Sequence, residues 1–378
     1  MSFSDSKKII FSISTLTGTI IGVGFFSLPY ITSKIGLPLM LFYFLALGVL
    51  VILIHVFYAE LVLKSPDFKR LPTFVGIYLG KKFKKIAFCT SILSHYGAIL
   101  AYFIVGGEFL HQLFFPLLGK TPLLATLLYF IGGSVFIFVG IRIIAKIELW
   151  GLILFLFILL LIFFRGFSEF RFENLFPAPQ LTYLFLPYGP ILFSLWGASL
   201  IPEIEEILGQ RKKLLKKIVV VSIIISIIVY LFFIFTVLGI SGLETAETAL
   251  ISLEKFLGRE VLNLALIFGI LTTFTSFIAL GLTLQKIFWY DLKIPKSIAS
   301  ILTCFVPLIL FLAGLKDFIF VISFMGGIML GIDGILILLM YRKLQLNFHK
   351  SKLLIFSIYP LILILLVGLI YEMIYFLK

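Results

Sequence analysis

Long runs of apolar residues, separated by short polar segments, fill almost the whole chain. A helix that crosses a membrane needs roughly 20 mostly apolar residues, whereas transmembrane β-strands would appear as segments of about 10 residues with alternating polarity. The pattern therefore predicts an all-α integral membrane protein with about eleven transmembrane helices. The predicted spans cover residues 9–30, 36–63, 85–115, 121–140, 147–165, 181–208, 218–240, 259–288, 297–314, 318–341 and 353–377.

The composition agrees with this interpretation and excludes several classes of protein. Hydrophobic residues make up 61% of the 378 positions and charged residues 13%, against about 45–50% and about 25% in soluble domains. A soluble fold could not bury the 44 phenylalanines. Soluble enzymes, nucleic-acid binders and secreted disulfide scaffolds are therefore excluded, and the lipid bilayer is the expected surroundings.

The segments between the predicted spans are too short to hold a second domain. The longest are about 64–84, 166–180 and 241–258, so we expect one transmembrane domain over residues 1–378. The first apolar run is long enough to span and has no A-x-A-like cleavage site. We therefore interpret it as a membrane helix and not as a removable signal peptide.

The distribution of basic residues predicts the orientation in the membrane. If the N-terminus is cytoplasmic, 23 of the 31 Lys and Arg residues fall on the cytoplasmic side and 8 on the outer side. Cytoplasmic loops carry an excess of these residues. We therefore expect a multi-pass protein of the cell membrane with a cytoplasmic N-terminus and an extracytoplasmic C-terminus, and the net charge of +13 mainly reflects this topology.

Glycine and proline interrupt the first predicted span. Gly18, Gly22, Gly24 and Pro29 lie within twelve residues, and relative to alanine each glycine costs a helix about 1 kcal/mol and proline about 3 kcal/mol. A broken helix survives in a membrane only where its backbone is buried in protein or lines a cavity. Because Gly18-x-x-x-Gly22 also matches a helix-packing motif, this span alone does not decide between a break and close packing.

The sixth span repeats the feature, since Gly197 precedes Pro202 by five positions, as Gly24 precedes Pro29. Interrupted spans at corresponding positions of two halves indicate the central site of a transporter. Five spans per half are odd in number, so the second half must be inverted relative to the first. This predicts inverted repeats at about 9–165 and 181–341, with an extra helix at 353–377.

The residues of these two spans resemble a known family. Gly18-Thr-Ile-Ile-Gly-Val-Gly-Phe-Phe-Ser-Leu-Pro29 and Leu200-Ile-Pro-Glu-Ile-Glu-Glu-Ile-Leu208 look like the amino acid/auxin permeases and the related aromatic amino acid permeases of the amino acid–polyamine–organocation superfamily. The resemblance implies a LeuT-type fold of five plus five inverted helices and one more, with helices 1 and 6 discontinuous. It also implies secondary amino acid transport by alternating access.

By this resemblance, the backbone N–H groups of Gly22, Val23 and Gly24 would receive the substrate carboxylate. The ammonium would meet carbonyls near Thr19, Phe193 and Ser194, and Phe193 and Trp196 would form the wall of the side-chain pocket. For the two aromatic residues, ordinary packing is the alternative. The abundance of phenylalanine suggests a neutral, large or aromatic amino acid as substrate.

The coupling ion stays open between Na⁺ and H⁺. In this fold a sodium site would use carbonyls of Gly18, Ile21 and Thr272 with the hydroxyls of Thr275 and Ser276; alternatively these hydroxyls bond back to their own helix. Many sodium-coupled relatives carry asparagine where this chain has Gly18, and some proton-coupled relatives carry a lysine within span 5, where only Lys146 stands at the start. No cofactor is expected beyond Na⁺ as a coupling ion.

Acidic and histidine side chains within spans are costly in a membrane and are therefore functional candidates. Asp333 and His95 are the best candidates for carrying a coupling proton, although Asp333 could instead cap an interrupted tenth helix. Two other functions remain as alternatives: an amino acid sensor of the same fold that does not transport, and a membrane-embedded lipid-modifying enzyme. The second is disfavoured because the acidic cluster Glu203, Glu205 and Glu206 adjoins a basic loop.

Overall fold

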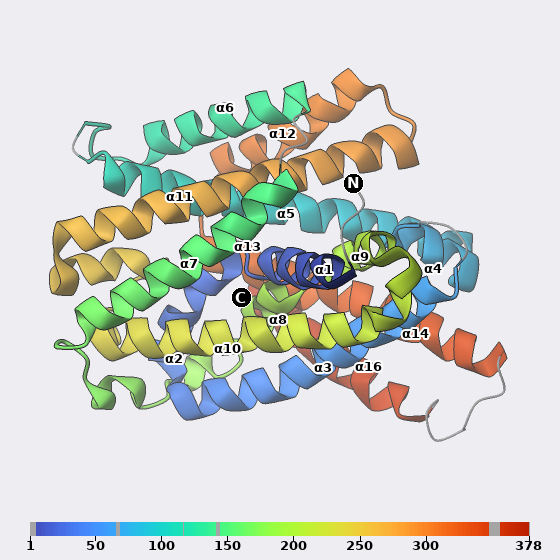
Figure 1. The fold of residues 1–378 in the computed structure, drawn as a ribbon, viewed down its shortest axis with the longest axis horizontal. Helices are drawn as coiled ribbons and strands as arrows, with labels where there is room; N and C mark the ends of the chain where they lie inside the picture. Colours follow the sequence, from blue (N-terminus) through green and yellow to red (C-terminus); the bar gives the residue numbers. More distant parts are fainter. Residues whose placement is uncertain (1–4, 66–68, 116, 141–143, 348–355, 378) are drawn as a thin grey trace.

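Long helices run roughly side by side along the molecule (Figure 1). The structure is a computed structural model that describes residues 5–65, 69–115, 117–140, 144–347 and 356–377. Over these residues the regular secondary structure is entirely helical.

The α-helices are α1 (Asp5–Ile20), α2 (Leu28–Ile35), α3 (Leu37–Leu63), α4 (Leu71–Leu79), α5 (Lys81–Leu113), α6 (Leu123–Val139), α7 (Ile144–Gly166), α8 (Tyr188–Leu195), α9 (Ile201–Leu208), α10 (Leu215–Ser241), α11 (Glu254–Lys286), α12 (Lys296–Leu312), α13 (Phe318–Phe324), α14 (Gly331–Asn347) and α16 (Ile358–Leu377). Short 3₁₀-helices are η1 (Val23–Ser27), η2 (Phe172–Leu175), η3 (Leu181–Tyr183), η4 (Ala198–Leu200), η5 (Gly209–Leu214), η6 (Gly242–Glu244) and η7 (Leu250–Leu253), and π-helical segments are η8 (Ile287–Asp291) and η9 (Met325–Leu330).

Each predicted span has a helical counterpart in the described part of the chain. The first span is α1, η1 and α2, the sixth is α8, η4 and α9, and the tenth is α13, η9 and α14. The predicted start of the eleventh span, residue 353, lies outside the described residues. The loop expected at 64–84 is wrong in part, because it contains α4. A proline in the first turn and Gly80 after the last residue, with a φ of 95°, delimit this helix, as is common for helix ends.

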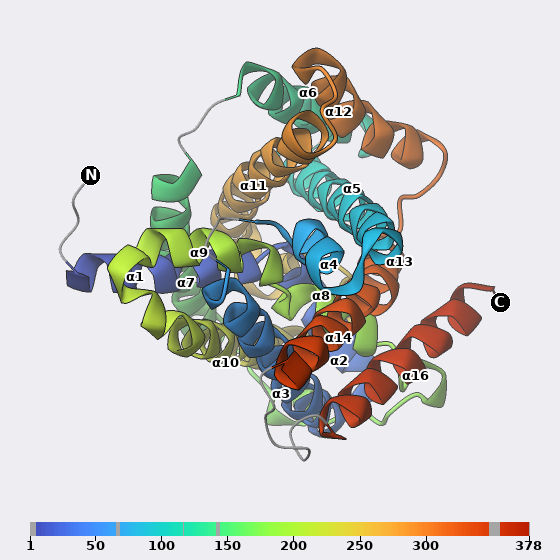
Figure 2. The ribbon, with the colours of Figure 1, turned by 90° about the vertical axis from the view of Figure 1, so that its right-hand side faces the viewer.

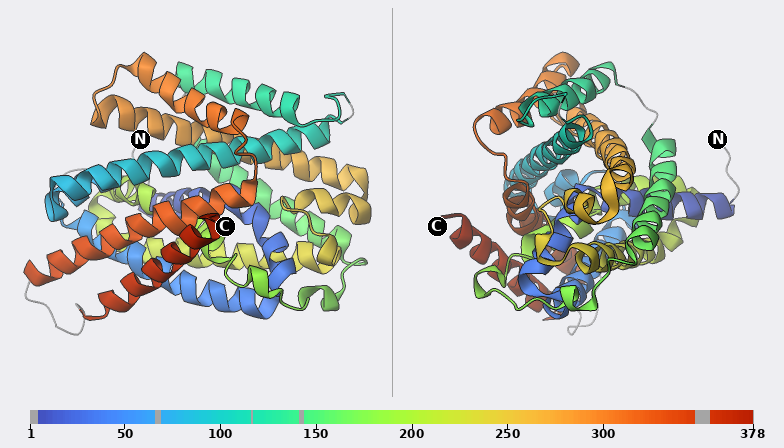
Figure 3. Two further views of the ribbon diagram at one scale, coloured as in Figure 1. Left: turned by 180° about the vertical axis from the view of Figure 1, so that it is seen from behind. Right: turned by 90° about the vertical axis from the view of Figure 1, so that its left-hand side faces the viewer.

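The broken sixth span lies near the centre of the bundle. Figure 2, a view at right angles to Figure 1, shows α8 in the middle, with α6 and α12 on one side. α8 contacts η1, η9, α3 and α13. The last helix, α16, runs along α14 at the edge of the molecule (Figure 3). The two interrupted segments therefore meet inside a shell of longer helices.

The outer surface of the bundle is apolar. On α6, Leu124, Leu128, Ile131, Val135 and Val139 are all exposed, at intervals of three or four residues, which places them on one face of the helix. Six helical stretches are long and apolar enough to cross a membrane, or seven if the bent pair Lys7–Ile20 and Val23–Ile35 counts as one span; α6, α12 and Ile153–Gly166 are shorter apolar helices. A lipid surrounding satisfies such a surface, which in water would favour aggregation.

The packing of η9 on α8 leads to a test of the fold. A Cβ at Gly326 would overlap the backbone carbonyl oxygen of Gly189, whereas a Cβ at Gly331, five residues on, would meet open space. Gly326→Ala should therefore lower the stability by about 1–3 kcal/mol through overpacking. Gly331→Ala should be neutral or stabilising, because alanine favours a helix over glycine. Thermal unfolding of both purified variants in detergent checks this, and equal melting temperatures would contradict the close approach of α8 and η9.

Candidate functional site

The first span breaks where its glycines predict. α1 ends at Ile20, and the following helical segment, Val23–Ile35, is bent by 50° from the first. Gly22 has an extended backbone (φ −98°, ψ −155°), and its N–H donates to the carbonyl of Ile20 at 2.7 Å. The break therefore exposes main-chain groups on both sides of Gly22, and the prediction of a discontinuous helix is confirmed.

The sixth span also breaks as predicted, between α8 and α9. Trp196 has an extended ψ of 118°, which ends α8. The N–H of Gly197 donates to Nε2 of His55 on α3 at 2.9 Å. The other ring nitrogen, Nδ1, lies 2.8 Å from the carbonyl of Val51, and a carbonyl only accepts. Nδ1 therefore carries the proton, and the neutral ring caps the break.

Tyr230 of α10 joins the two breaks. Its hydroxyl oxygen lies 2.6 Å from the carbonyl oxygen of Ile20 and 2.8 Å from that of Ser194, and the side chain is fully buried. A hydroxyl has a single hydrogen, so it donates to one of these carbonyls at a time. The ends of α1 and α8 are thereby held against one side chain.

A cavity of about 210 Å³ opens beside the two breaks. Six of the seven residues predicted to contact substrate line this cavity. The seventh, Val23, is buried and is not part of the lining. The six are Thr19, Gly22, Gly24, Phe193, Ser194 and Trp196.

The glycines of the first break are needed for space. A Cβ at Gly22 would overlap the hydroxyl of Tyr102 on α5, and one at Gly24 would overlap the hydroxyl of Ser194 and approach Cδ1 of Phe193 to 2.8 Å. The close approach is therefore to neighbouring side chains that themselves line the cavity. The hydroxyl of Ser194 is buried, and the described residues offer it no hydrogen-bond partner.

A second cavity, of about 220 Å³, lies between α1, α7 and α11. All five residues predicted to bind Na⁺ line it: Gly18, Ile21, Thr272, Thr275 and Ser276. The Thr275 hydroxyl donates to the Thr272 carbonyl at 3.1 Å, which is the alternative bonding pattern considered above. A hydroxyl that donates keeps its lone pairs, so this bond leaves the oxygen able to bind a cation. Ser276 lines both cavities.

The two candidates for carrying a proton face the first cavity. Asp333, in the first turn of α14, accepts a short hydrogen bond from the hydroxyl of Thr90 on α5. His95, also on α5, has Nδ1 2.7 Å from the carbonyl of Ser91. Toward the start of α4, an ion pair of 2.9 Å between Arg70 and Asp291 forms part of the same lining.

Three side chains at the site are not among the functional candidates that the sequence analysis selects; of these, His55 was expected to lie near a span end and reach toward the membrane surface, which is wrong because it is fully buried. His55, Tyr102 and Tyr230 stand in apolar stretches of α3, α5 and α10, where nothing nearby marks them. The clue available was their chemistry, because polar groups within membrane spans are generally paired or functional. In the described part of the chain, no group of three or more His, Cys, Asp and Glu residues is arranged to hold a metal ion.

Comparison with solved structures identifies the fold. Mhp1, a nucleobase-cation-symport-1 family transporter, matches in its inward-facing conformation with a TM-score of 0.67 and 12% identity, over 89% of this chain and 76% of Mhp1. In its closed conformation with bromovinylhydantoin bound, the TM-score is 0.62 over 86% and 76% of the two chains, again at 12% identity. MhsT in complex with L-phenylalanine matches with a TM-score of 0.60 and 14% identity, over 97% of this chain and 98% of MhsT. The predicted LeuT-type fold is confirmed.

Sequence comparison identifies the family. Tyrosine-specific transport system 1 of Haemophilus influenzae is 25% identical over 341 residues, which cover 85% of this chain and 84% of that protein. The model of the tryptophan/tyrosine permease family matches residues 5–376. The assignment to the amino acid/auxin permeases is therefore wrong. It depended on glycine and proline positions in two spans, and helix breaks of this kind are a property of the fold.

A permease moves its substrate without changing it chemically, so the alternative of a membrane-embedded enzyme is removed and the predicted secondary amino acid transporter is confirmed. With the family model covering nearly its whole length, the chain belongs to the tryptophan/tyrosine permease family.

Proposed function

We propose that this transporter carries tryptophan or tyrosine across the membrane, together with a cation. The observation that carries the proposal is that residues of both helix breaks line one cavity. The family name and the tyrosine-specific relative support an aromatic substrate, as does MhsT with its bound L-phenylalanine. The walls contributed by Phe193 and Trp196 suit a ring, since aromatic groups pack well against one another.

The carboxylate and the ammonium of the amino acid would both be held by main-chain groups. The N–H groups of Gly22, Val23 and Gly24 begin the second half of the first span, and the N-terminus of a helix favours an anion such as the substrate carboxylate. The Gly22 N–H donates to the Ile20 carbonyl in this structure, so it would have to exchange this bond for one to the substrate. The carbonyls of Phe193 and Ser194 end α8 and, with that of Thr19, would accept the ammonium. In this structure the Ser194 carbonyl accepts from the Tyr230 hydroxyl at 2.8 Å and the Phe193 carbonyl from the Trp196 N–H at 3.4 Å. A carbonyl oxygen has two lone pairs, so each can accept a second hydrogen bond from the ammonium.

The structure offers one candidate site for Na⁺ and one for H⁺ as the coupling cation. The second cavity brings together carbonyl and hydroxyl oxygens of the kind that bind hard cations such as Na⁺, from Gly18, Ile21, Thr272, Thr275 and Ser276. For a proton, Asp333 and His95 face the substrate cavity. Because residues of the first break line both cavities, a movement of this break on substrate binding would change the surroundings of either ion.

The glycine at position 24 tests the substrate site. Gly24→Ala should abolish tryptophan and tyrosine binding, because its methyl group would overlap the Ser194 hydroxyl and crowd Phe193, both of which line the cavity. Gly132→Ala, whose Cβ would make an ordinary contact 3.5 Å from Phe274, is the matched control and should bind normally. The measurement is equilibrium binding of radiolabelled tryptophan to the purified proteins. Unchanged binding by Gly24→Ala would refute the proposed cradle for the carboxylate.

The coupling ion is tested by uptake into proteoliposomes with an imposed Na⁺ or H⁺ gradient. If Na⁺ couples, Ser276→Ala should raise the Na⁺ concentration for half-maximal uptake about tenfold, because a ligand oxygen is lost. Thr303→Ala on α12, which removes a hydroxyl bonded only to the Ala299 carbonyl in the described structure, should not change it. If H⁺ couples, Asp333→Asn should abolish uptake driven by the pH gradient. Uptake that ignores both gradients would contradict ion coupling.

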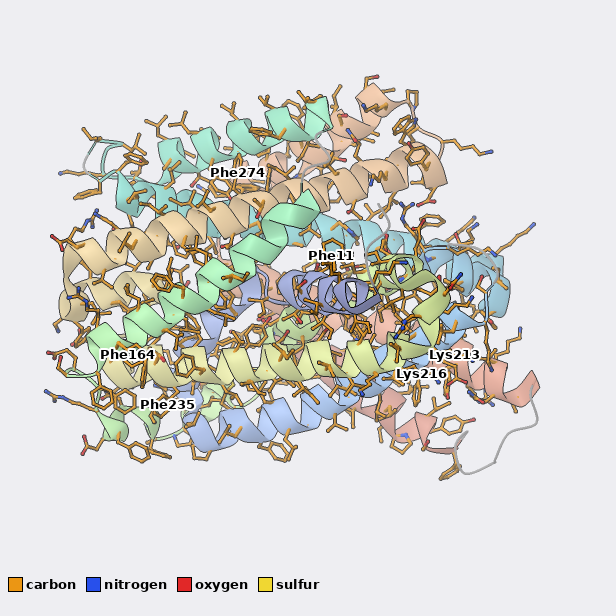
Figure 4. The ribbon with its side chains drawn as sticks, viewed as in Figure 1. Phe11, Phe164, Lys213, Lys216, Phe235 and Phe274 are labelled. Carbon is orange, nitrogen blue, oxygen red and sulfur yellow. The ribbon has the colours of Figure 1, made fainter. Side chains whose placement is uncertain are left out.

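We propose further that the N-terminus is cytoplasmic and the C-terminus extracytoplasmic. Lys213 and Lys216 lie at one end of α10, and Phe235 toward the other (Figure 4), and basic residues favour the cytoplasmic side.

Reporter fusions in a bacterial host test this orientation. Alkaline phosphatase fused after the last residue should be active, because it folds only outside the cytoplasm, whereas the same enzyme inserted after Lys213 should be inactive. The opposite pair of results would invert the proposed topology.

A further inference from the structure

We propose that Nε2 of His95 accepts a hydrogen bond from the ring of the substrate, from the indole N–H of tryptophan or the hydroxyl of tyrosine, and so selects these two amino acids over phenylalanine. The inference rests on the proposed function, since it names how the same cavity reads the aromatic ring. It uses His95 as a specificity-determining residue and does not require that His95 carry a proton.

The hydrogen bonding of the ring determines what His95 can offer. Nδ1 lies 2.7 Å from the carbonyl oxygen of Ser91, one turn earlier on α5. A carbonyl oxygen only accepts hydrogen bonds, so Nδ1 must be the protonated nitrogen of the neutral ring, and Nε2 is left as an acceptor. His95 lines the substrate cavity, and its hydrogen bond in the described structure is the one made by Nδ1. An indole N–H is a donor without acceptor capacity, so it needs an acceptor of this kind.

The distance along α5 suits an aromatic amino acid. Tyr102 stands with its hydroxyl against Gly22, at the proposed carboxylate end, and His95 lies seven residues earlier on the same helix. At a rise of 1.5 Å per residue, the two positions are about 10 Å apart along the axis. An extended tyrosine or tryptophan, with a hydrogen bond at each end, covers that span. Both residues line the one cavity.

The wall between these two positions is apolar and leaves room for a ring. Ala98, with the smallest side chain that carries a Cβ, lies between them on the cavity face of α5. Ala279 and Leu280 of α11 and Met325 of η9 also line the cavity. An apolar middle with polar groups at both ends is complementary to an aromatic amino acid whose ring carries an N–H or O–H group.

Several other polar groups of the cavity already have partners. Asp333 accepts from Thr90, and Asp291 pairs with Arg70. The hydroxyl of Thr283 donates to the Ala279 carbonyl at 2.9 Å. The hydroxyls of Ser94 and Ser194 also line the cavity and are buried without a hydrogen-bond partner in the described residues, but a neutral hydroxyl is a weaker acceptor than a carboxylate. Glu203 is the strongest competing acceptor, because one of its carboxylate oxygens is buried without a hydrogen-bond partner in the described residues. It belongs to α9 and not to the helix that carries Tyr102, so it is included in the test as the rival residue.

The test measures how tyrosine, tryptophan and phenylalanine each displace radiolabelled tryptophan from the purified full-length protein. The wild type should prefer tyrosine and tryptophan over phenylalanine by about tenfold or more, because a site built around a hydrogen bond rejects a ligand that lacks the group. In His95→Leu this preference should disappear, with the affinity for phenylalanine retained. His95→Gln, whose side-chain oxygen can replace Nε2 as an acceptor, should restore much of it.

Two further variants make the result specific. His111→Leu, at the other end of α5, where His111 contacts the Gly119 carbonyl, makes the same substitution away from the cavity and should leave the preference unchanged. Glu203→Leu, which removes the rival acceptor, should also leave it unchanged. The inference is overturned if His95→Leu keeps the wild-type preference, or if Glu203→Leu removes it.

The same measurements distinguish a wrong substrate assignment from a wrong role for His95. If the wild-type protein binds none of the three aromatic amino acids, measured directly with each labelled compound, the proposed substrate is wrong and the inference falls with it. If the wild type binds tryptophan and tyrosine but discriminates against phenylalanine equally well without His95, only the inference is wrong.

Discussion

The constraint on which the rest of this structure depends is that two helices are interrupted inside the protein, where the exposed main chain cannot rely on lipid for hydrogen bonds. Two fully buried side chains meet this need. Tyr230 supplies a donor to the carbonyls of Ile20 and Ser194, and His55 supplies an acceptor to the N–H of Gly197. A buried main-chain group left without a partner would cost about 1–3 kcal/mol, so these contacts stabilise an otherwise unfavourable backbone.

These two side chains come from helices that are themselves continuous. His55 belongs to α3 and Tyr230 to α10, which contain 27 residues each and pack against one another. Two unbroken helices thus hold the two broken ones, and the cavity forms in the space that the breaks leave between them. The division suits a transporter, because a rigid pair can keep its own packing while the segments attached to it change their contacts.

The parts of the molecule that could be predicted are those with a local signal. The spans follow from apolar runs, the breaks from Gly22, Gly24, Gly197 and Pro202, and six of the cavity-lining residues from the resemblance of the segments around these breaks to known permeases. The role of His55 could not be predicted in this way, since its partner Gly197 lies 142 positions away. The helix α4 was missed although its proline and Gly80 were visible, because it is short and lies between two spans. The family was misassigned because the recognised pattern marks the fold and does not distinguish families within it.

The two cavities share part of their boundary, and this has a thermodynamic consequence. Gly22, Tyr102 and Ser276 line both, so a ligand that displaces this common wall changes the space on its other side. Linkage is reciprocal: if occupying one cavity strengthens binding in the other by some factor, the converse effect has the same size. Tyr102 and Gly22 lie in tight contact and line both cavities, so a species bound in one cavity would act on a species bound in the other through this shared wall, without touching it.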